Sequence, residues 1–220
     1  MMKNELIREL LKGGYLRNPL ILETFEKIDR KDFVPAELES SAYLNEPLPI
    51  GFGQTISQPL TVAFMLELLD PHPGEQILEV GAGSGWVSAL LAYCVEDEGK
   101  KSGHVVAIER IRELKDMAER HISKYSFLGR GIVEIILGDG SRGAPPEHCP
   151  PGGFDKIISA ASAKEIPEVW KKQVKVRGRI VAPVWQSILV LDKISPTECR
   201  EREYFGFSFV PLVSDSDKNR

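Results

Sequence analysis

The sequence predicts an α/β fold in which helices cover both faces of a mostly parallel, seven-stranded sheet, preceded by a helical extension. From residue 76 onward, short apolar runs alternate with segments of helical periodicity, which is typical of a doubly wound parallel sheet. The last two apolar runs have no helix between them, so at least one is expected to run antiparallel. With 220 residues, the chain is expected to form one domain: residues 1–57 as helices and a functional loop, and residues 58–220 as the core.

The N-terminal extension is expected to begin with two helices. The first is amphipathic and ends at Gly13, and the second begins at Pro19 with Asn18 as its N-cap. The stretch from 32 to 57 is rich in turn-forming residues and is expected to be irregular. A third helix is expected from Gln58 to Leu69, because apolar residues return there at helical spacing.

The core is expected to alternate strands and helices along the chain. Each predicted strand is a short apolar run, and the predicted helices show apolar residues three and four positions apart. The predicted strands cover 76–81, 104–109, 132–139, 154–161, 179–184, 187–194 and 203–213. The predicted helices cover 84–95, a segment around 114–122, and 166–175.

The composition argues against several classes of protein and site. A net charge of −4 and the lack of a long basic stripe disfavour an extended nucleic-acid surface. Three widely spaced cysteines and four scattered histidines indicate neither a disulfide framework nor a metal site. The longest apolar region, 77–95, carries Glu79 and three glycines, which is unlike a membrane span. We therefore expect a cytoplasmic protein that binds no metal, nucleic acid or membrane.

Three glycines follow the first core strand, at Gly81, Gly83 and Gly85. Glycines at such a turn let the backbone approach a ligand closely, and the next helix offers unpaired N–H groups to an anionic end. A dinucleotide fingerprint would need glycine in place of Trp86, which disfavours a dehydrogenase. The Gly-x-Gly-x-Gly form behind Glu79 instead resembles the first motif of the Rossmann-like, class I methyltransferases that bind S-adenosylmethionine (AdoMet).

Acidic residues at the ends of the next two strands support this resemblance. Glu109 ends the second core strand, where a carboxylate can accept hydrogen bonds from both ribose hydroxyls. Asp139 ends the third, where it can accept one from an adenine amino group. Taken singly, the glycines fit a tight turn, Glu109 a surface ion pair and Asp139 an ordinary turn. Their presence at three successive strand ends favours a ligand, because ligands bind at the carboxyl ends of parallel strands.

Further stretches along the chain point to one family. "FVPAEL", "AYLNEPLPIGFGQTISQP", "LEVGAGSGW", "AIERI", "GDG", "FDKIISAA", "EIP" and "FVPL" occur in the order found in protein-L-isoaspartate O-methyltransferases. The sequence resembles this family from about Asp32 to Val213, and Gln-Thr-Ile-Ser-Gln-Pro is the most specific part of the resemblance.

The resemblance implies methyl transfer from AdoMet, with S-adenosylhomocysteine as product, to the free carboxylate of L-isoaspartyl and, less readily, D-aspartyl residues in damaged proteins and peptides. The ester then closes to a succinimide, whose hydrolysis returns some normal aspartate. The resemblance implies that Ser57 is the active-site residue and that the substrate lies near Ala160, Ala161 and Val213. The implied cofactor-binding residues are Ile56, Glu79, Gly81, Ala82, Gly83, Gly85, Glu109, Arg110, Gly138, Asp139 and Gly140.

A hydroxyl such as that of Ser57 suffices for this reaction. The acceptor carboxylate, with an ordinary pKa of roughly 3.9, is ionised at neutral pH and needs no general base. Transfer then depends on alignment and on exclusion of water, and Ser57 can hold one carboxylate oxygen while the other attacks. Local sequence alone favours Ser57 as the N-cap of the helix that follows, a role compatible with catalysis. Thr55 and Thr61 are expected to be structural.

The sequence departs from the family pattern mainly on the acceptor side. The departing residues are Asn45, Trp86, Ala160, Ala161, Ser162, Arg177, Trp185 and Val213. Two of them, Arg177 and Trp185, stand where the family commonly has glycine. Because the cofactor motifs persist, two alternatives stay open: a methyltransferase of this fold with another acceptor, such as an RNA base, and a non-catalytic AdoMet-binding module.

Overall fold

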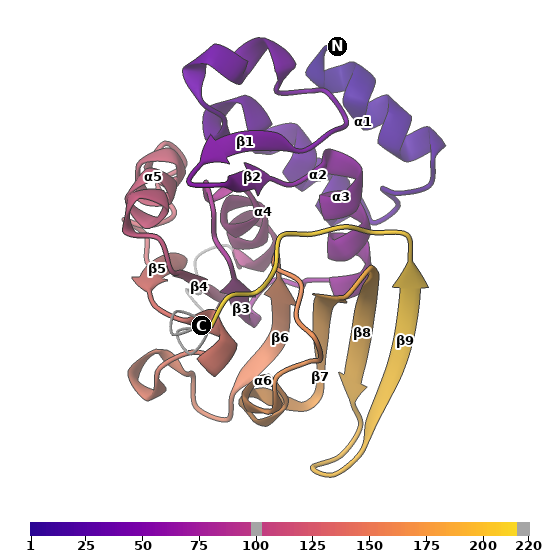
Figure 1. Cartoon of the computed structure of the whole chain (residues 1–220), viewed down its shortest axis with the longest axis vertical. Helices are drawn as coiled ribbons and strands as arrows, with labels where there is room; N and C mark the ends of the chain where they lie inside the picture. Colours follow the sequence, from indigo (N-terminus) through magenta and orange to yellow (C-terminus); the bar gives the residue numbers. More distant parts are fainter. Residues whose placement is uncertain (98–102, 215–220) are drawn as a thin grey trace.

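The computed structural model describes residues 1–97 and 103–214, which form a seven-stranded sheet covered by helices (Figure 1). All neighbouring strands run parallel except β8, which is antiparallel to both of its neighbours. This confirms the predicted fold class and the antiparallel strand near the end. From one edge to the other, the strands are β5 (Val133–Leu137), β4 (His104–Glu109), β3 (Gln76–Val80), β6 (Phe154–Ser159), β7 (Val174–Val184), β8 (Ser187–Lys193) and β9 (Cys199–Phe205).

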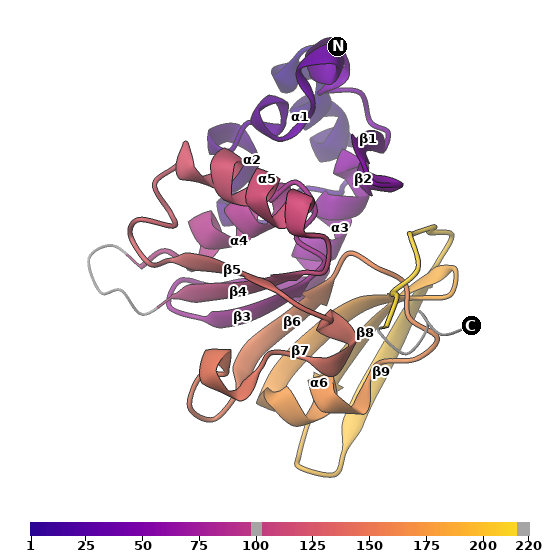
Figure 2. The same ribbon diagram turned by 60° about the vertical axis from the view of Figure 1, so that its left-hand side comes forward.

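The predicted helices are present, and they lie on opposite sides of the sheet (Figure 2). Asn18 caps α2 as predicted, because its side-chain oxygen accepts the N–H of Leu20 at 2.9 Å. Among the described residues, no helix has the length and apolar composition needed to cross a membrane. The α-helices are α1 (Lys3–Lys12), α2 (Pro19–Lys27), α3 (Pro59–Leu69), α4 (Trp86–Val95), α5 (Arg112–Ser123) and α6 (Glu168–Gln173).

Two apolar cores lie on the two faces of the sheet. Neighbouring residues of β3 point to opposite faces, so Ile77 belongs to one core and Leu78 to the other. The first core joins the sheet to α1 through α5, and the second joins it to α6 and Ala144. The prediction that residues 1–57 and 58–220 form one domain stays a prediction, supported by this shared first core.

The segment predicted to be irregular contains a short hairpin, so that prediction was wrong for residues 48–56. Strands β1 (Leu48–Gly51) and β2 (Gln54–Ile56) pair antiparallel around a turn at Phe52 and Gly53. Both turn residues have positive φ, 54° and 70°, as the tight turns that suit a right-twisted hairpin require. Two 3-10 helices, η1 (Arg30–Phe33) and η2 (Ala36–Ser41), precede the hairpin, and residues 42–47 are irregular as predicted.

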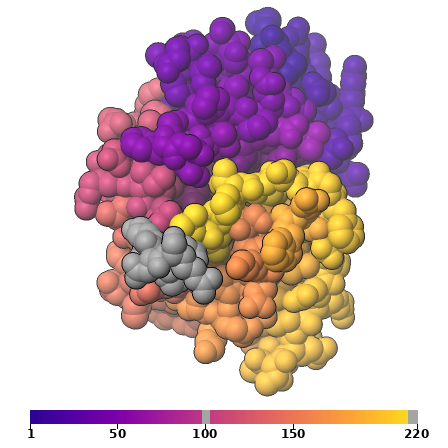
Figure 3. Space-filling view, in the orientation of Figure 1, coloured from indigo at the N-terminus to yellow at the C-terminus, as the bar shows by residue number. Residues whose placement is uncertain are grey.

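The predicted last strand, 203–213, was also wrong over most of its length. Strand β9 ends at Phe205, and the chain turns at Gly206, where φ is +96°. The following residues cross the carboxyl ends of the strands (Figure 1), and they lie between the N-terminal part and the sheet (Figure 3). There the Ser162 N–H donates to the Val210 carbonyl at 2.8 Å, and the Leu212 N–H donates to the Ser162 carbonyl at 2.7 Å. This crossing brings the C-terminal segment over the site.

Strand β7 begins earlier than predicted, at Val174 instead of Arg179, and α6 is correspondingly shorter. An irregular register between β6 and β7 accommodates the extra length, and Arg177 lies in it with φ of +69°. Trp185, in the turn that follows β7, has φ of +54°. Both residues therefore adopt a backbone conformation that favours glycine.

Candidate active site

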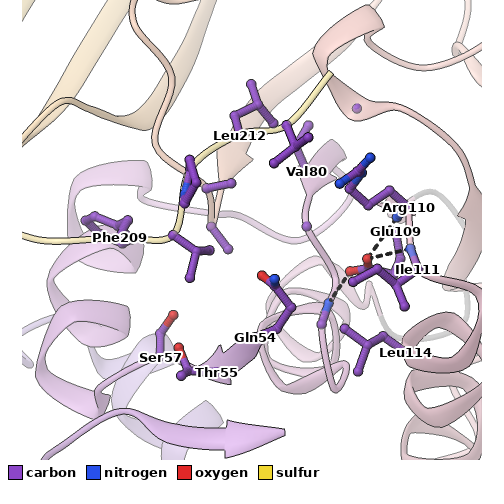
Figure 4. Close-up of a pocket in the computed structure, with 18 of the residues that line it drawn as sticks. Gln54, Thr55, Ser57, Val80, Glu109, Arg110, Ile111, Leu114, Phe209 and Leu212 are labelled. Carbon is purple, nitrogen blue, oxygen red and sulfur yellow. Dashed lines mark hydrogen bonds between the residues drawn. The ribbon is translucent and has the colours of Figure 1, made fainter. Parts of the chain in front are cut away.

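A cavity of about 380 Å³ lies at the carboxyl ends of the central strands (Figure 4). Its floor comes from the ends of β3, β4 and β6 and from Gly138 and Gly140 beyond β5, and its walls come from the β2 region and the C-terminal segment 208–213. The predicted site residues that line it are Ser57, Gly81, Gly83, Glu109, Arg110, Gly138, Gly140, Ala160, Ala161 and Val213. The parallel topology thus brings together residues that lie far apart in the sequence.

The glycine loop shapes one wall of the cavity. Gly81, Gly83 and Gly85 have φ of +90°, +55° and +89°. A Cβ on Gly81 would lie 3.6 Å from the Cβ of Ala160, which also lines the cavity. Glycine at position 81 therefore leaves this part of the cavity open. Gly85 is different, because its Cβ would lie 3.0 Å from the Cβ of Ala118 on α5. We infer that Gly85 serves helix packing, while Gly81 and Gly83 face the cavity.

Glu109 is held rigidly at the end of β4. One carboxylate oxygen accepts the N–H groups of Arg110 and Ile111 at 2.8 and 2.9 Å, and the other accepts that of Gly83 at 2.8 Å (Figure 4). The side chain is 5% exposed yet lines the cavity, so its remaining lone pairs face the open space. This arrangement fixes an anionic acceptor where ribose hydroxyls were predicted to bind.

Glu79 lies beneath the cavity and not in its wall. Its side chain is 1% exposed, one oxygen accepts the hydroxyl of Ser88, and the other oxygen has no hydrogen-bond partner in the described structure. Burial, reinforced by the nearby charge of Glu109, raises the pKa of Glu79 to about 8, against the hydrogen bond from Ser88. Glu79 also lines a very small chamber that adjoins Ser57 and Phe209. An unpaired buried carboxyl oxygen favours a cationic or donor group next to it.

Asp139 does not line the cavity, although its two neighbours do. Its carboxylate accepts the N–H and the hydroxyl of Ser141, at 2.9 and 2.6 Å, and caps the short 3-10 helix η3 (Gly140–Arg142). Gly138 and Gly140 line the cavity on either side of it. The predicted adenine contact of Asp139 stays a prediction, and the backbone around it is the part that faces the cavity.

Two more predicted cofactor residues, Ile56 and Ala82, do not line the cavity. They are 4% and 5% exposed and belong to the first apolar core. Ala82 contributes through its backbone, because its N–H donates to the Ile108 carbonyl at 3.2 Å and its carbonyl accepts the Gly85 N–H at 2.8 Å. Both residues therefore support the loops that form the site.

Ser57 lines both the cavity and the small chamber beside Glu79. The structure contradicts its predicted role as a helix cap, because the N-cap position of α3 is Gln58. The hydroxyl of Ser57 has no hydrogen-bond partner among the described residues, and so it is available to a ligand. Thr55 and Thr61, expected to be structural, also line the cavity, although the Thr61 hydroxyl donates to Gln58 at 3.3 Å.

Asn45 takes over the capping of α3 from outside the helix. Its side-chain oxygen accepts the N–H of Leu60 at 3.0 Å, and its amide group donates to Glu9 at 3.1 Å. The side chain of Gln58 in turn donates to the Asn45 carbonyl at 2.8 Å. A neutral residue therefore holds the loop before Ser57 against α1 and α3.

Several lining residues escaped the sequence analysis. Gln54 lies beside Ser57 and points into the cavity, and its only signal was its place in the Gln-Thr-Ile-Ser stretch (Figure 4). Ile111 and Leu114 follow Glu109 and give the cavity an apolar wall. Phe209 and Leu212 arrive from the C-terminal segment, which was expected to lie in the sheet. No group of three or more His, Cys, Asp or Glu side chains in the described part of the chain is arranged to hold a metal ion.

Comparison with known proteins decides the family. A family profile described as protein-L-isoaspartate(D-aspartate) O-methyltransferase matches residues 1–217. The chain belongs to this family. The protein-L-isoaspartate O-methyltransferase of Ignicoccus hospitalis is 43% identical, over 97% of this chain and 98% of its own length, and that of Methanopyrus kandleri is 40% identical, over 97% and 92%. The predictions of family and enzyme class are confirmed.

A solved structure supports the fold of this isoaspartyl methyltransferase family member. It is described as a candidate protein-L-isoaspartate O-methyltransferase of Plasmodium falciparum in complex with S-adenosyl-L-homocysteine. Its TM-score is 0.84 at 24% identity, and the match covers 95% of this chain and 97% of that one. This likeness concerns the fold, and it is membership of the methyltransferase family that confirms the prediction of AdoMet as cofactor.

Proposed function

We propose that the cavity binds AdoMet and that Ser57 orients the acceptor carboxylate in the reaction that family membership assigns to the chain. That reaction is AdoMet-dependent methylation of L-isoaspartyl residues, the first step in repair of damaged proteins. Activity on D-aspartyl residues is a finer part of the proposal, supported by the family description. The observation that carries the proposal is the unpaired Ser57 hydroxyl in the wall of a cavity that also contains Glu109.

The residues present fit the cofactor. When bound, AdoMet supplies a methyl group on a positively charged sulfonium, and its sulfur leaves as a neutral thioether. Glu109 offers fixed acceptors to a ribose diol, and the partnerless oxygen of Glu79 can accept from an ammonium group near the glycine loop. Ile111 and Leu114 offer apolar surface to a purine ring. The acidic side chain of Glu109 in the cavity wall also suits a cationic ligand.

Ser57 acts on the acceptor side by positioning. The isoaspartyl carboxylate is ionised at neutral pH and supplies the electron pair for the new oxygen–carbon bond, so the chain needs to remove no proton. The free hydroxyl of Ser57 can donate to one carboxylate oxygen, which leaves the other to attack the methyl carbon. Holding the reacting atoms in line is worth several kcal/mol of barrier, in the manner of other positioned reactants.

The C-terminal segment helps to enclose the reaction. Phe209 and Leu212 line the cavity together with Gln54, and backbone hydrogen bonds at Ser162 tie their segment to the loop after β6. Apolar side chains at this point keep water away from the sulfonium, which water would otherwise attack. Ala160 and Ala161, at the end of β6, leave room for a peptide beside this enclosure.

The test is methyl transfer from labelled AdoMet to a short peptide that contains isoaspartate. Peptides of the same sequence with normal aspartate or D-aspartate at that position are compared with it. Wild type, Ser57→Ala and Ser123→Ala are assayed together, with S-adenosylhomocysteine binding measured by calorimetry. Ser123 is the matched control, because its hydroxyl donates to Arg120 within α5. We expect wild type to methylate the isoaspartyl peptide and Ser57→Ala to lose at least tenfold in kcat with unchanged cofactor binding.

Two outcomes contradict different parts of the proposal. Full activity of Ser57→Ala would remove Ser57 from the site. Tight cofactor binding by wild type without transfer to the isoaspartyl peptide would overturn the substrate and favour another acceptor or a binding module. The predicted cytoplasmic location, and the predicted lack of nucleic-acid, membrane and metal partners, stay predictions.

A further inference from the structure

Arg30 lies outside the cavity but forms hydrogen bonds to both ends of the loop that carries Ser57. Its side chain is buried, and its guanidinium donates to backbone carbonyls. One terminal nitrogen donates to Ala42 at 2.7 Å and to Leu44 at 3.3 Å. The other donates to Glu46 at 3.0 Å and to Ser57 itself at 3.1 Å. A single planar group therefore joins the start of the loop to its end.

The guanidinium is also fixed relative to the glycine loop. Its central carbon lies 5.2 Å from the centroid of the Trp86 indole, within the range of a cation–π contact. Trp86 is the first residue of α4, directly after Gly85, and it packs edge-on against Phe25 at 5.7 Å. Arg30 thus connects the cofactor side of the site to the carbonyl of Ser57.

The polar side chains at the base of the loop make connections of a different kind. Asn45 and Gln58 close the base of the loop, but they tie it to α1 and to α3. The hairpin β1–β2 projects from this base and carries Gln54 and Thr55 to the cavity. A small shift of the loop base at Asn45 and Gln58 would displace the hydroxyl of Ser57 by a similar distance.

Burying this cation has a cost that packing alone does not explain. Desolvation lowers the pKa of Arg30 to about 10, partly offset by the charge of Glu46, and its Nε has no hydrogen-bond partner in the described structure. An apolar side chain of similar size would avoid this desolvation and is often as stable or more so. A planar fork that bonds four carbonyls offers what an apolar side chain lacks, which is fixed geometry.

We propose that Arg30 is a positioning residue that sets the place of Ser57 relative to the bound cofactor. It acts through the Ser57 backbone and through Trp86, and it touches neither substrate nor cofactor. The proposal rests on the role given above to Ser57. Because a displacement of about 1 Å at a reacting group can cost about a hundredfold in rate, the effect is expected in kcat.

The test uses Arg30→Lys, which keeps the charge but has a single nitrogen that cannot bridge two pairs of carbonyls. Arg179→Lys is the matched control, because Arg179 also donates to a backbone carbonyl, that of Leu68 at 2.7 Å, and does not line the cavity. Both are made in wild type and in Ser57→Ala, and kcat is expressed per site that binds S-adenosylhomocysteine. Normalising in this way removes any loss that comes from unfolded protein.

We expect Arg30→Lys to lower kcat at least tenfold in wild type but less than threefold in Ser57→Ala, with cofactor affinity within threefold. Equal fold losses in the two backgrounds, or an unchanged kcat, would overturn the proposal. Amide hydrogen exchange over residues 48–57, measured with S-adenosylhomocysteine bound, gives a second readout that needs no turnover. It should accelerate at least tenfold in Arg30→Lys only, and unchanged exchange would also overturn the proposal. A wild type that methylates no isoaspartyl peptide counts against the proposed function instead.

Discussion

Replacing Glu79 with glutamine should make the protein more stable at pH 8 while leaving its stability near pH 5 almost unchanged. Burial raises the pKa of this carboxyl group to about 8, from an ordinary value of 4.5. Between these two values the unfolded chain releases the proton and the folded chain keeps it. The free energy of unfolding of the wild type therefore falls as the pH rises through this window, and it levels off above pH 8. Glutamine is neutral throughout and avoids this loss.

The size of the effect follows from the same two values. A tenfold change in proton affinity is worth about 1.4 kcal/mol, so the upper limit at pH 8 is about 5 kcal/mol. Relaxation around a buried charge reduces this figure, and we expect a gain of about 2 kcal/mol or more. The amide introduced by Glu79→Gln keeps an oxygen that can accept the hydroxyl of Ser88, the present partner of Glu79. Hydrogen bonding therefore changes little.

Urea unfolding at half-unit steps from pH 5 to pH 9 measures the difference between the two proteins. Glu113→Gln, at an exposed position in the first turn of α5, is the control and should give a flat difference. A constant difference between wild type and Glu79→Gln across this range would refute the argument, because it would mean that Glu79 titrates alike in the folded and unfolded chains. The same variant should bind S-adenosylhomocysteine at least tenfold more weakly, because an amide nitrogen, which only donates, replaces the partnerless oxygen offered to an ammonium group.

Three further substitutions test other parts of the structure. Gly85→Ala should destabilise the fold by about 2–4 kcal/mol in urea unfolding, because φ is +89° and the new Cβ would lie 3.0 Å from Ala118. Arg177→Gly should raise stability by about 1 kcal/mol by relieving φ of +69°, and a loss would contradict that account. Glu109→Gln should weaken S-adenosylhomocysteine binding at least tenfold by calorimetry, because an amide nitrogen cannot accept the N–H groups now bound; unchanged affinity would exclude Glu109 from cofactor binding.

The sequence was most informative where backbone geometry demands a particular residue. The Gly81–Gly85 loop and the acid at the end of β4 were predicted, because strand ends of a parallel sheet converge and glycine is needed where φ is positive. The hairpin was missed because its turn is Phe52–Gly53, which lacks the Asn-Gly or Asp-Gly signature of such turns. Phe52 adopts φ of +54° there, a conformation that a phenylalanine in the sequence does not predict.

The C-terminal segment was misassigned because apolar residues that line a cavity give the same sequence pattern as apolar residues of a buried strand. Phe207 stacks on Phe64 at 5.3 Å, while Phe209 and Leu212 line the cavity, so apolar residues recur as they would in a strand. Arg30 gave no signal at all, because arginine is usually exposed and its partners here are carbonyl groups common to every residue. Contacts to the backbone leave no trace in the pattern of side chains.

The departures from the family pattern preserve the backbone that carries the site. Arg177 and Trp185 replace residues that the family commonly has as glycine, and each still adopts the positive φ that glycine would give, so the turns keep their shape. Asn45 still supplies an oxygen acceptor, to the Leu60 N–H. What changes is the surface beside the acceptor side, where the Trp185 indole is 67% exposed and its carbonyl accepts the hydroxyl of Ser162 at 3.0 Å. Because Arg177 and Trp185 are exposed and lie away from the loop that carries Ser57, we expect these two substitutions to change which peptides bind well, while the methyl transfer itself stays the same.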